Sequence, residues 1–348
     1  MVSTTEKRKA EHLKLCATKD VAYKEKTTLL ECVELSYKSL PEISMADVNL
    51  ATSFLGKEFA FPLMASAITG GTQAAKKVNR DIALACQSLG IGMGLGSMRA
   101  MLEQPSLIET YAVRDIAPDI FLAANIGAAQ LKQYSVAELT DALGALEADA
   151  LAIHLNAAQE AVQPEGDADF SGIIEKIAYF AENLNVPVYV KEVGHGISFE
   201  VAAVLRDTKI KAIDVQGAGG TSWTAVDSLR HKEGFGKAFW DFGIPTAVSV
   251  LDVRNALRGI DKKIVASGGI RNGIEAVKAL VLGADLVATS MPILKAQQKS
   301  GSKGVEDFLF GMKREMEITS FLLGCKNLDE LHKEHFVMTG KLKDWVKQ

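Results

Sequence analysis

The polar residues between His154 and Glu160 have the types and the spacing needed to bind an anion and a metal ion. They cross the end of an apolar run, and residues two apart in a strand point to the same side, so the imidazole of His154 and the amide of Asn156 enter one space. Gln159 and Glu160 follow directly. One carboxylate such as Glu160 can bind Mg²⁺ when substrate phosphates supply further oxygens. The alternative is that Glu160 begins a solvated helix.

A glycine-rich turn, Ser-Gly-Gly-Ile-Arg-Asn-Gly, occupies residues 267–273, between an apolar run and a helical pattern. Glycines let backbone N–H groups surround a phosphate, and the N-terminus of a helix favours an anion. Residues 288–292, at the end of the next apolar run, offer further amides. We therefore expect a phosphate group at this turn; the alternative is a tight turn that needs glycine only for its backbone shape.

Two cations stand at the ends of other apolar runs. Lys191 must find an anion or reach water, so it either neutralises an electron-rich ligand or pairs with a carboxylate such as Glu192 or Asp214. Arg99 offers a planar, permanently charged fork for a phosphate. Polar or glycine-containing positions at the remaining run ends are residues 69–71, Asn125 and residues 219–223.

All of these residues stand at the ends of eight apolar runs, most of them followed by a turn and an amphipathic segment. The runs cover residues 61–67, 91–96, 120–126, 150–156, 187–193, 212–216, 263–267 and 285–290. In a (β/α)₈ TIM barrel the chemistry lies at the carboxyl ends of the strands, which is where these residues stand. We predict such a barrel as a single domain over residues 1–348, with residues 1–60 as an N-terminal extension and a long loop after the sixth strand.

Three segments need a separate interpretation. Residues 246–250 form a ninth apolar run, which we interpret as helix because Pro245 precedes a helical stripe. Residues 28–40 have a helix-like pattern that ends at Pro41, and residues 218–243 have the length of an active-site lid. A doubly wound open sheet is the structural alternative, but its glycine turn usually follows the first strand, whereas the clearest turn here follows the seventh.

The composition excludes several classes of protein. The chain has 348 residues, 48% of them hydrophobic and 24% charged, with a net charge of −4, so it can bury a large core and has no general attraction to nucleic acid or a membrane surface. The four cysteines lack zinc or disulfide spacing. We see neither a secretory leader nor an apolar run of the ~20 residues that a membrane span needs. We expect a cytoplasmic enzyme with a small-molecule substrate.

The sequence offers no cysteine at a loop tip and no second carboxylate paired with Glu160, so a cofactor is expected to carry the chemistry. Taken together, the motifs resemble those of the type 2, flavin-dependent isopentenyl diphosphate isomerases over nearly the whole chain. The specific motifs are Arg-Lys at residues 8–9 and His-x-Asn-x-x-Gln-Glu at residues 154–160, while Gly-Gly-x-Arg at residues 268–271 is shared with many FMN barrels. The resemblance implies FMN, Mg²⁺, NADPH to reduce the flavin, and a homo-oligomer, either a tetramer or an octamer.

The resemblance also implies a role for each matching residue. FMN would be held by Ala67, Ile68, Thr69, Ser97, Asn125, Lys191, Thr221, Gly269, Ile270, Arg271, Ser290 and Met291. The diphosphate substrate would be held by Arg8, Lys9, His12, Ser97, Met98, Arg99, His154, Asn156 and Gln159. Glu160 would bind the metal, and the catalytic residues would be Gln159, His154 and Lys191.

The implied reaction is the interconversion of isopentenyl and dimethylallyl diphosphate in isoprenoid biosynthesis, with reduced FMN as acid and base and no net redox change. One alternative is an FMN-dependent oxidoreductase that oxidises a 2-hydroxyacid or dihydroorotate. Such an enzyme needs a dedicated base, for which His231 is the obvious candidate. A further alternative is a phosphate-binding barrel without redox chemistry.

Overall fold

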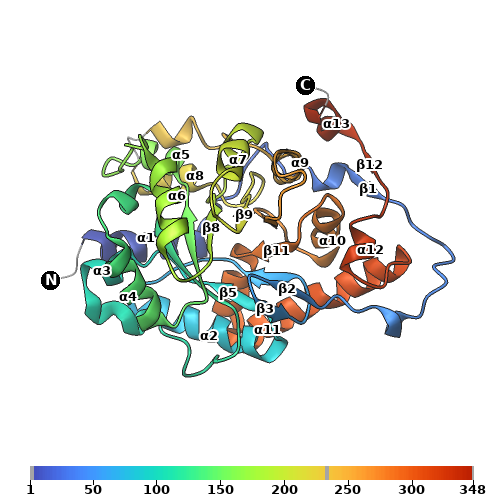
Figure 1. Ribbon diagram of the computed structural model, residues 1–348, viewed down its shortest axis with the longest axis horizontal. Helices are drawn as coiled ribbons and strands as arrows, with labels where there is room; N and C mark the ends of the chain where they lie inside the picture. The colour runs from blue at the N-terminus through green and yellow to red at the C-terminus, as the bar shows by residue number, and fades with distance from the viewer. Residues whose placement is uncertain (1–3, 232–234, 347–348) are drawn as a thin grey trace.

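A closed barrel of eight parallel strands lies at the centre of the computed structural model, which describes residues 4–231 and 235–346 (Figure 1). The strands follow one another around the barrel in chain order, and the last pairs with the first. They are β4 (Leu63–Ala65), β5 (Gly92–Gly94), β6 (Leu122–Gly127), β7 (Ala150–His154), β8 (Val188–Lys191), β9 (Ala212–Asp214), β10 (Lys263–Ser267) and β11 (Leu286–Thr289). Seven of the predicted runs contain one of these strands, and the eighth, residues 120–126, overlaps β6, which ends one residue later, so the predicted TIM barrel is confirmed.

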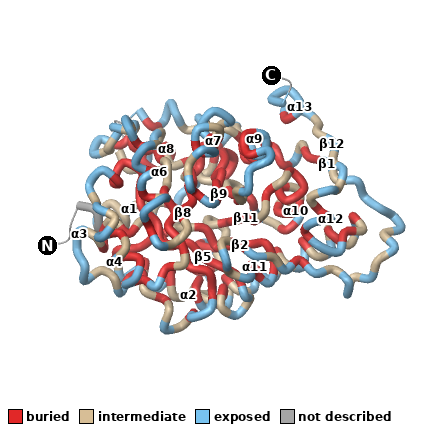
Figure 2. Tube along the Cα trace, in the orientation of Figure 1, coloured by how far each residue is buried: buried red, intermediate tan, exposed pale blue. Residues whose placement is uncertain are grey.

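Helices surround the barrel, and their inner faces join the strands in one hydrophobic core (Figure 2). The covering helices are α2 (Gln73–Leu89), α3 (Arg99–Glu103), α4 (Val136–Leu146), α6 (Ile173–Asn183), α7 (Phe199–Arg206), α9 (Thr246–Ala256), α10 (Gly273–Val281) and α11 (Met291–Leu322), the last kinked at Ser300 and Gly301. Helix α9 confirms the interpretation of the ninth apolar run. Among the described residues, none of the helices has the length and apolarity to cross a membrane.

The connection between β9 and α9 was predicted as a long loop, but its described part is largely structured. It contains α8 (Trp223–Arg230) and the 3-10 turn η5 (Phe235–Lys237), while residues 232–234 lie outside the described residues. Ser222 caps α8, because its side chain accepts a hydrogen bond from the Ala225 N–H. The short helix α5 (Ala157–Val162) follows β7 and packs against α8. The two helices therefore form one wall at the carboxyl end of the barrel.

The N-terminal extension reaches both ends of the barrel. Helix α1 (Thr4–Thr18) packs on α8 and α11 at the carboxyl end of the strands. The hairpin of β2 (Thr52–Phe54) and β3 (Lys57–Phe59) lies at the amino end, where Phe54 contacts the rings of Phe121 and Tyr189. The extension thus covers the mouth of the barrel and closes its base.

The helix predicted over residues 28–40 is wrong. Leu29 takes a left-handed backbone conformation with φ of 56°, and only the short 3-10 turn η1 (Leu30–Cys32) follows. Residues of β1 (Val33–Leu35) then pair antiparallel with β12 (Phe336–Met338), so the backbone hydrogen bonds of a helix are replaced by those of a ladder. The remaining short elements are η2 (Met45–Asp47), η3 (Pro105–Thr110), η4 (Ala129–Lys132), α12 (Leu328–Leu331) and α13 (Gly340–Val346).

Candidate active site

A cavity of about 480 Å³ lies at the carboxyl ends of the barrel strands, beneath α1. All eight strand ends contribute residues to its wall, as the barrel architecture requires of an active site. Helix α1 supplies Arg8, Lys9, His12, Leu13 and Cys16, so the arm covers the cavity of its own chain.

The predicted site residues line this cavity with one exception, Met98. The side chain of Met98 is fully buried in the hydrophobic core, because this apolar residue packs inward at the start of α3. A contact between Met98 and a ligand therefore has no support in the structure. The lining residues that the sequence did not indicate as ligand contacts include Ser66, Gln130, Gln163, Gln216 and Lys295.

One end of the cavity has the structure of a phosphate site. Gly268 and Gly269 take positive φ values of 96° and 73°, which glycine adopts without strain. A side-chain carbon on Gly220 would lie 2.4 Å from the Gly269 nitrogen, so the two turns need glycine to pack together. Arg271 donates to the carbonyl oxygens of Gly269 at 2.7 Å and Gly219 at 2.8 Å, which holds the two turns to each other.

The first turn of α11 faces the same end of the cavity, together with Lys295. Backbone N–H groups in the first turn of a helix have no partner within the helix and attract anions. The glycine turn, the N-terminus of a long helix and two cations, Arg271 and Lys295, together fit the phosphate group of a cofactor such as FMN.

The middle of the cavity holds a neutral histidine. His154 Nδ1 lies 2.7 Å from Asn125 Oδ1, and Asn125 Nδ2 donates to the Leu95 carbonyl at 3.1 Å, which fixes the orientation of the amide. Nδ1 therefore carries the hydrogen of the neutral ring. Burial, with the nearby charges of Lys191 and Lys9, lowers the pKa of His154 to about 3. In this state Nε2 is free to accept a hydrogen bond.

Cations gather at the other end of the cavity, under α1. Lys9 Nζ donates to the Ser97 carbonyl at 2.5 Å and to the Tyr111 hydroxyl at 2.6 Å. Burial, and then the charge of Arg8, lower the pKa of Lys9 to about 7. Arg99 points a second guanidinium into the same space while its Nε is 2.7 Å from Glu103. Such a group of partly buried cations favours a multiply charged anion.

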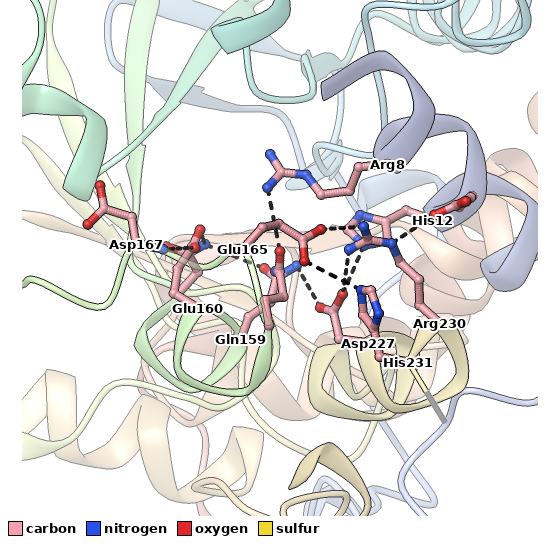
Figure 3. Close-up of polar contacts among 12 residues, drawn as sticks. Arg8, His12, Gln159, Glu160, Glu165, Asp167, Asp227, Arg230 and His231 are labelled. Carbon is pink, nitrogen blue, oxygen red and sulfur yellow. Dashed lines mark hydrogen bonds and ion pairs between the residues drawn. The ribbon is translucent and has the colours of Figure 1, made fainter. Parts of the chain in front are cut away.

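Glu160 is buried, so the alternative of a solvated helix start is wrong. Its carboxylate accepts hydrogen bonds from Asn156 Nδ2 and from the Asp167 N–H, both at 2.7 Å (Figure 3). Asn156 Oδ1 is buried and has no hydrogen-bond partner among the described residues. Within residues 4–231 and 235–346, no group of three or more His, Cys, Asp or Glu side chains is placed to hold a metal ion. A metal here would need amide and ligand oxygens beside Glu160.

Asp227 is a central residue of the site that the sequence did not indicate. It lies buried on α8, with its carboxylate 3.1 Å from His12 Nε2, 3.2 Å from Gln159 Nε2 and 3.5 Å from Arg230 Nη1 (Figure 3). It therefore joins the N-terminal arm to α5. The available signal was its position one helical turn after Trp223, which lines the cavity, whereas Asp227 lies behind the lining residues.

His231, the candidate base of an oxidoreductase, is not among the residues that line the cavity. Its Nε2 lies 3.4 Å from Glu165, beside Asp227 and Arg230 (Figure 3). The structure therefore gives no base of the kind that the oxidoreductase alternative requires at this position.

Comparisons with known proteins agree with a flavin-binding barrel. A mandelate oxidase mutant with the monooxide FMN adduct has a TM-score of 0.67 at 16% identity and covers 94% of this chain and 95% of its own. A flavocytochrome b2 mutant with pyruvate bound has a TM-score of 0.72 at 17% identity, over 94% of this chain and 83% of its own. At these identities the likeness concerns the fold alone. The model of the FMN-dependent dehydrogenase family matches residues 3–108 and 121–338.

Closer relatives carry a more specific name. The isopentenyl-diphosphate delta-isomerase of Pyrococcus abyssi is 44% identical over 98% of this chain and 94% of its own length. The enzyme of the same name from Methanosarcina mazei is 41% identical over 100% of this chain and 96% of its own. The chain therefore belongs to the FMN-dependent dehydrogenase family and, within it, to the type 2 isopentenyl diphosphate isomerases. The family name supports the predicted FMN cofactor. The comparisons do not test the predicted Mg²⁺ and NADPH.

Replacement of Arg271 by alanine tests the phosphate end of the cavity. Loss of both guanidinium hydrogen bonds should separate the two glycine turns, and we expect FMN affinity to fall at least about tenfold, the equivalent of 1.4 kcal/mol. Equilibrium dialysis with FMN measures this. Arg314→Ala, on the exposed side of α11, is the control and should bind FMN like the parent protein. Equal FMN affinity in the Arg271 variant would show that the turn does not hold the cofactor.

Proposed function

We propose that this protein interconverts isopentenyl and dimethylallyl diphosphate, with reduced FMN as acid and base and no net redox change. The observation that carries the proposal is a single cavity with a phosphate-fitting turn at one end and a cluster of cations at the other. Two phosphorylated molecules can thus lie in it together, a cofactor and a substrate. The names of full-length relatives at 41–44% identity support the same activity.

The cofactor would lie with its phosphate on the turn that contains Gly269 and Arg271 and against the start of α11. Its ring would then lie toward Lys191, whose Nζ donates to the Glu192 carbonyl at 2.7 Å inside the barrel. When bound in its reduced form, FMN supplies the acid and the base for moving the proton, since the cavity offers no evident acid–base pair of side chains. An ammonium at this position would stabilise an anionic reduced ring.

The substrate diphosphate would bind to Arg8, Lys9 and Arg99, and to His154 after the bound anion leads Nε2 of this ring to take up a proton. An arginine guanidinium can donate two hydrogen bonds to a pair of phosphate oxygens, and partial burial strengthens each hydrogen bond. Helix α1 covers the cavity and excludes water from a reaction in which an unactivated alkene must accept a proton. Fixing both ends of the substrate is the main contribution of the chain, because proton transfer needs close approach.

Glu160 is proposed to bind Mg²⁺ together with the unpartnered Asn156 Oδ1 and oxygens of the diphosphate. Mg²⁺ prefers oxygen ligands and commonly takes only one or two from protein carboxylates. Gln159 would orient the alkenyl end of the substrate, and its amide is itself held by the hydrogen bond to Asp227. Asp227 thus acts on the substrate through Gln159.

The FMN oxidoreductase alternative has less support. His231 lies away from the cavity wall, and His154 already donates to Asn125 among several positive charges. We further propose NADPH as the reductant of the flavin, a cytoplasmic location, and assembly into a homo-oligomer, either a tetramer or an octamer.

Anaerobic turnover assays test the function directly. With FMN, Mg²⁺ and isopentenyl diphosphate, we expect dimethylallyl diphosphate to form only after the flavin is reduced, with far less than one NADPH consumed per product. Dithionite in place of NADPH is the control and should support the same rate. Consumption of one NADPH per product, or oxidation of a 2-hydroxyacid without isomerisation, would contradict the proposal.

The pKa of Lys9 predicts how activity depends on pH. Because this pKa is lowered to about 7, the ammonium is present below pH 7 and is lost as the pH rises above it. Since kcat/KM reports ionisations of the free enzyme, kcat/KM should fall about tenfold per pH unit above pH 7 if only the charged form of Lys9 binds the diphosphate.

Two variants on α1 separate this effect from other ionisations. Lys9→Met should have a low kcat/KM without this fall between pH 6.5 and 8.5. Lys14→Met, an exposed position on the same helix, should behave like the parent protein. A Lys9→Met variant that keeps the full pH dependence would show that another group causes it.

A further inference from the structure

Asp214 is a fully buried carboxylate just behind the cavity wall, at the end of β9. Ser267 Oγ donates to its Oδ1 at 2.5 Å, and the Gln216 N–H does so at 3.4 Å. Its Oδ2 has no hydrogen-bond partner among the described residues. A carboxylate oxygen without a partner in the interior is costly unless a nearby positive charge compensates it.

The register of β8 and β9 places the positive charge of Lys191 beside Asp214. Lys191 on β8 is the register partner of Asp214, so the two side chains extend from neighbouring strands at the same level of the barrel. Lys191 is also buried, and it lines the cavity while Asp214 lies behind it. The carboxylate and the ammonium are thus neighbouring buried charges on adjacent strands, although they make no direct ion pair, and the positive charge is the one that lines the cavity.

Few other charged groups face Lys191. On β7 its register partner is His154, which is neutral because its pKa is lowered to about 3. On β8 itself, burial raises the pKa of Tyr189, so the phenol is neutral too. On β10 the facing residue is Ser267.

Glu192 is the other carboxylate near Lys191, but its charge is already compensated. Its Oε2 accepts the backbone N–H groups of Val193, Gly194 and His195 at 2.6 to 2.7 Å. Three such donors stabilise a carboxylate without any cation. Among the described residues, this leaves Asp214 as the carboxylate near Lys191 with a fully buried oxygen that lacks a donor.

We propose that Asp214 keeps Lys191 in its ammonium form and directed into the cavity, and is therefore a positioning residue for the charge that faces the cofactor ring. This inference rests on the proposed FMN site. Burial alone lowers the pKa of Lys191, and the Asp214 carboxylate is the larger of the two charges that raise it. Without that carboxylate the pKa of Lys191 falls further, so the neutral amine forms at a lower pH, and the neutral amine cannot stabilise an anionic ring.

Sulfite binding to the oxidised holoprotein measures this charge. The sulfite electron pair forms a bond to flavin N5 and moves one negative charge onto the ring, so its affinity reports a nearby cation without any added oxidant or reductant. Affinities are compared with the parent protein at each pH from 6 to 9, which cancels the protonation of sulfite itself. The variants are Asp214→Asn, Lys191→Met and, as a control that keeps both buried charges, Arg314→Ala on the exposed side of α11.

We expect Lys191→Met to bind sulfite weakly at every pH and Arg314→Ala to keep the profile of the parent protein. Asp214→Asn should bind sulfite like the parent protein at pH 6 and at least about tenfold more weakly at pH 9, because loss of the opposite charge lowers the pKa of Lys191 further. An Asp214→Asn profile that differs from the parent by a constant factor at all pH values indicates a merely structural role and overturns the inference.

The other outcomes separate this inference from the proposed function. Absence of FMN uptake by the parent protein would overturn both. Unchanged sulfite affinity in Lys191→Met would show that Lys191 does not face the ring, which overturns the inference while the isomerase activity is judged by its own assay.

A second variant covers the case in which Asp214→Asn does not fold. Lys191→Arg carries a charge at every pH. Its sulfite affinity relative to the parent protein should stay constant from pH 6 to 9 if Asp214 keeps Lys191 charged over that range. If the affinity of Lys191→Arg divided by that of the parent protein grows at least tenfold toward pH 9, then Lys191 loses its charge in the parent protein. That result would overturn the inference.

Discussion

The structure depends on the concentration of positive charge in a partly buried space. The parallel strands deliver their carboxyl ends to one cavity, and the cations there outnumber the carboxylates that face them. Burial of positive charge is unfavourable, and it lowers the pKa values of Lys9, Lys191 and Arg8. Anionic ligands offset this cost, so the arrangement favours the binding of phosphorylated molecules.

The N-terminal arm completes this arrangement by closing the cavity from above. Lys9 is bound to the Ser97 carbonyl and the Tyr111 hydroxyl, and His12 to Asp227, so polar contacts on two sides hold α1 in place. The arm and the barrel wall therefore depend on each other: the contacts that position α1 also position Gln159 through Asp227. A change in one of these contacts should affect both the cover of the cavity and the binding of the substrate.

Much of the barrel could be predicted from the sequence, because a strand buried on both faces appears as a short apolar run. Polar residues at the end of such a run stand out from it and mark the site. The helix predicted over residues 28–40 was wrong for a reason that local pattern cannot show: its partner is β12, about 300 residues away. Asp227 was missed because a carboxylate on an amphipathic helix looks solvated until its neighbours are known. Motif matching placed Met98 at the ligand, although its side chain packs inward.

The central claim is that one cavity holds a flavin at one end and a diphosphate at the other. A crystal structure of the protein with FMN, Mg²⁺ and isopentenyl diphosphate tests it most directly. The account predicts the FMN phosphate on the Gly269 turn, the diphosphate between Arg8, Lys9 and Arg99, and the metal on Glu160. A diphosphate bound at the Gly269 turn, or outside the cavity beneath α1, would contradict it.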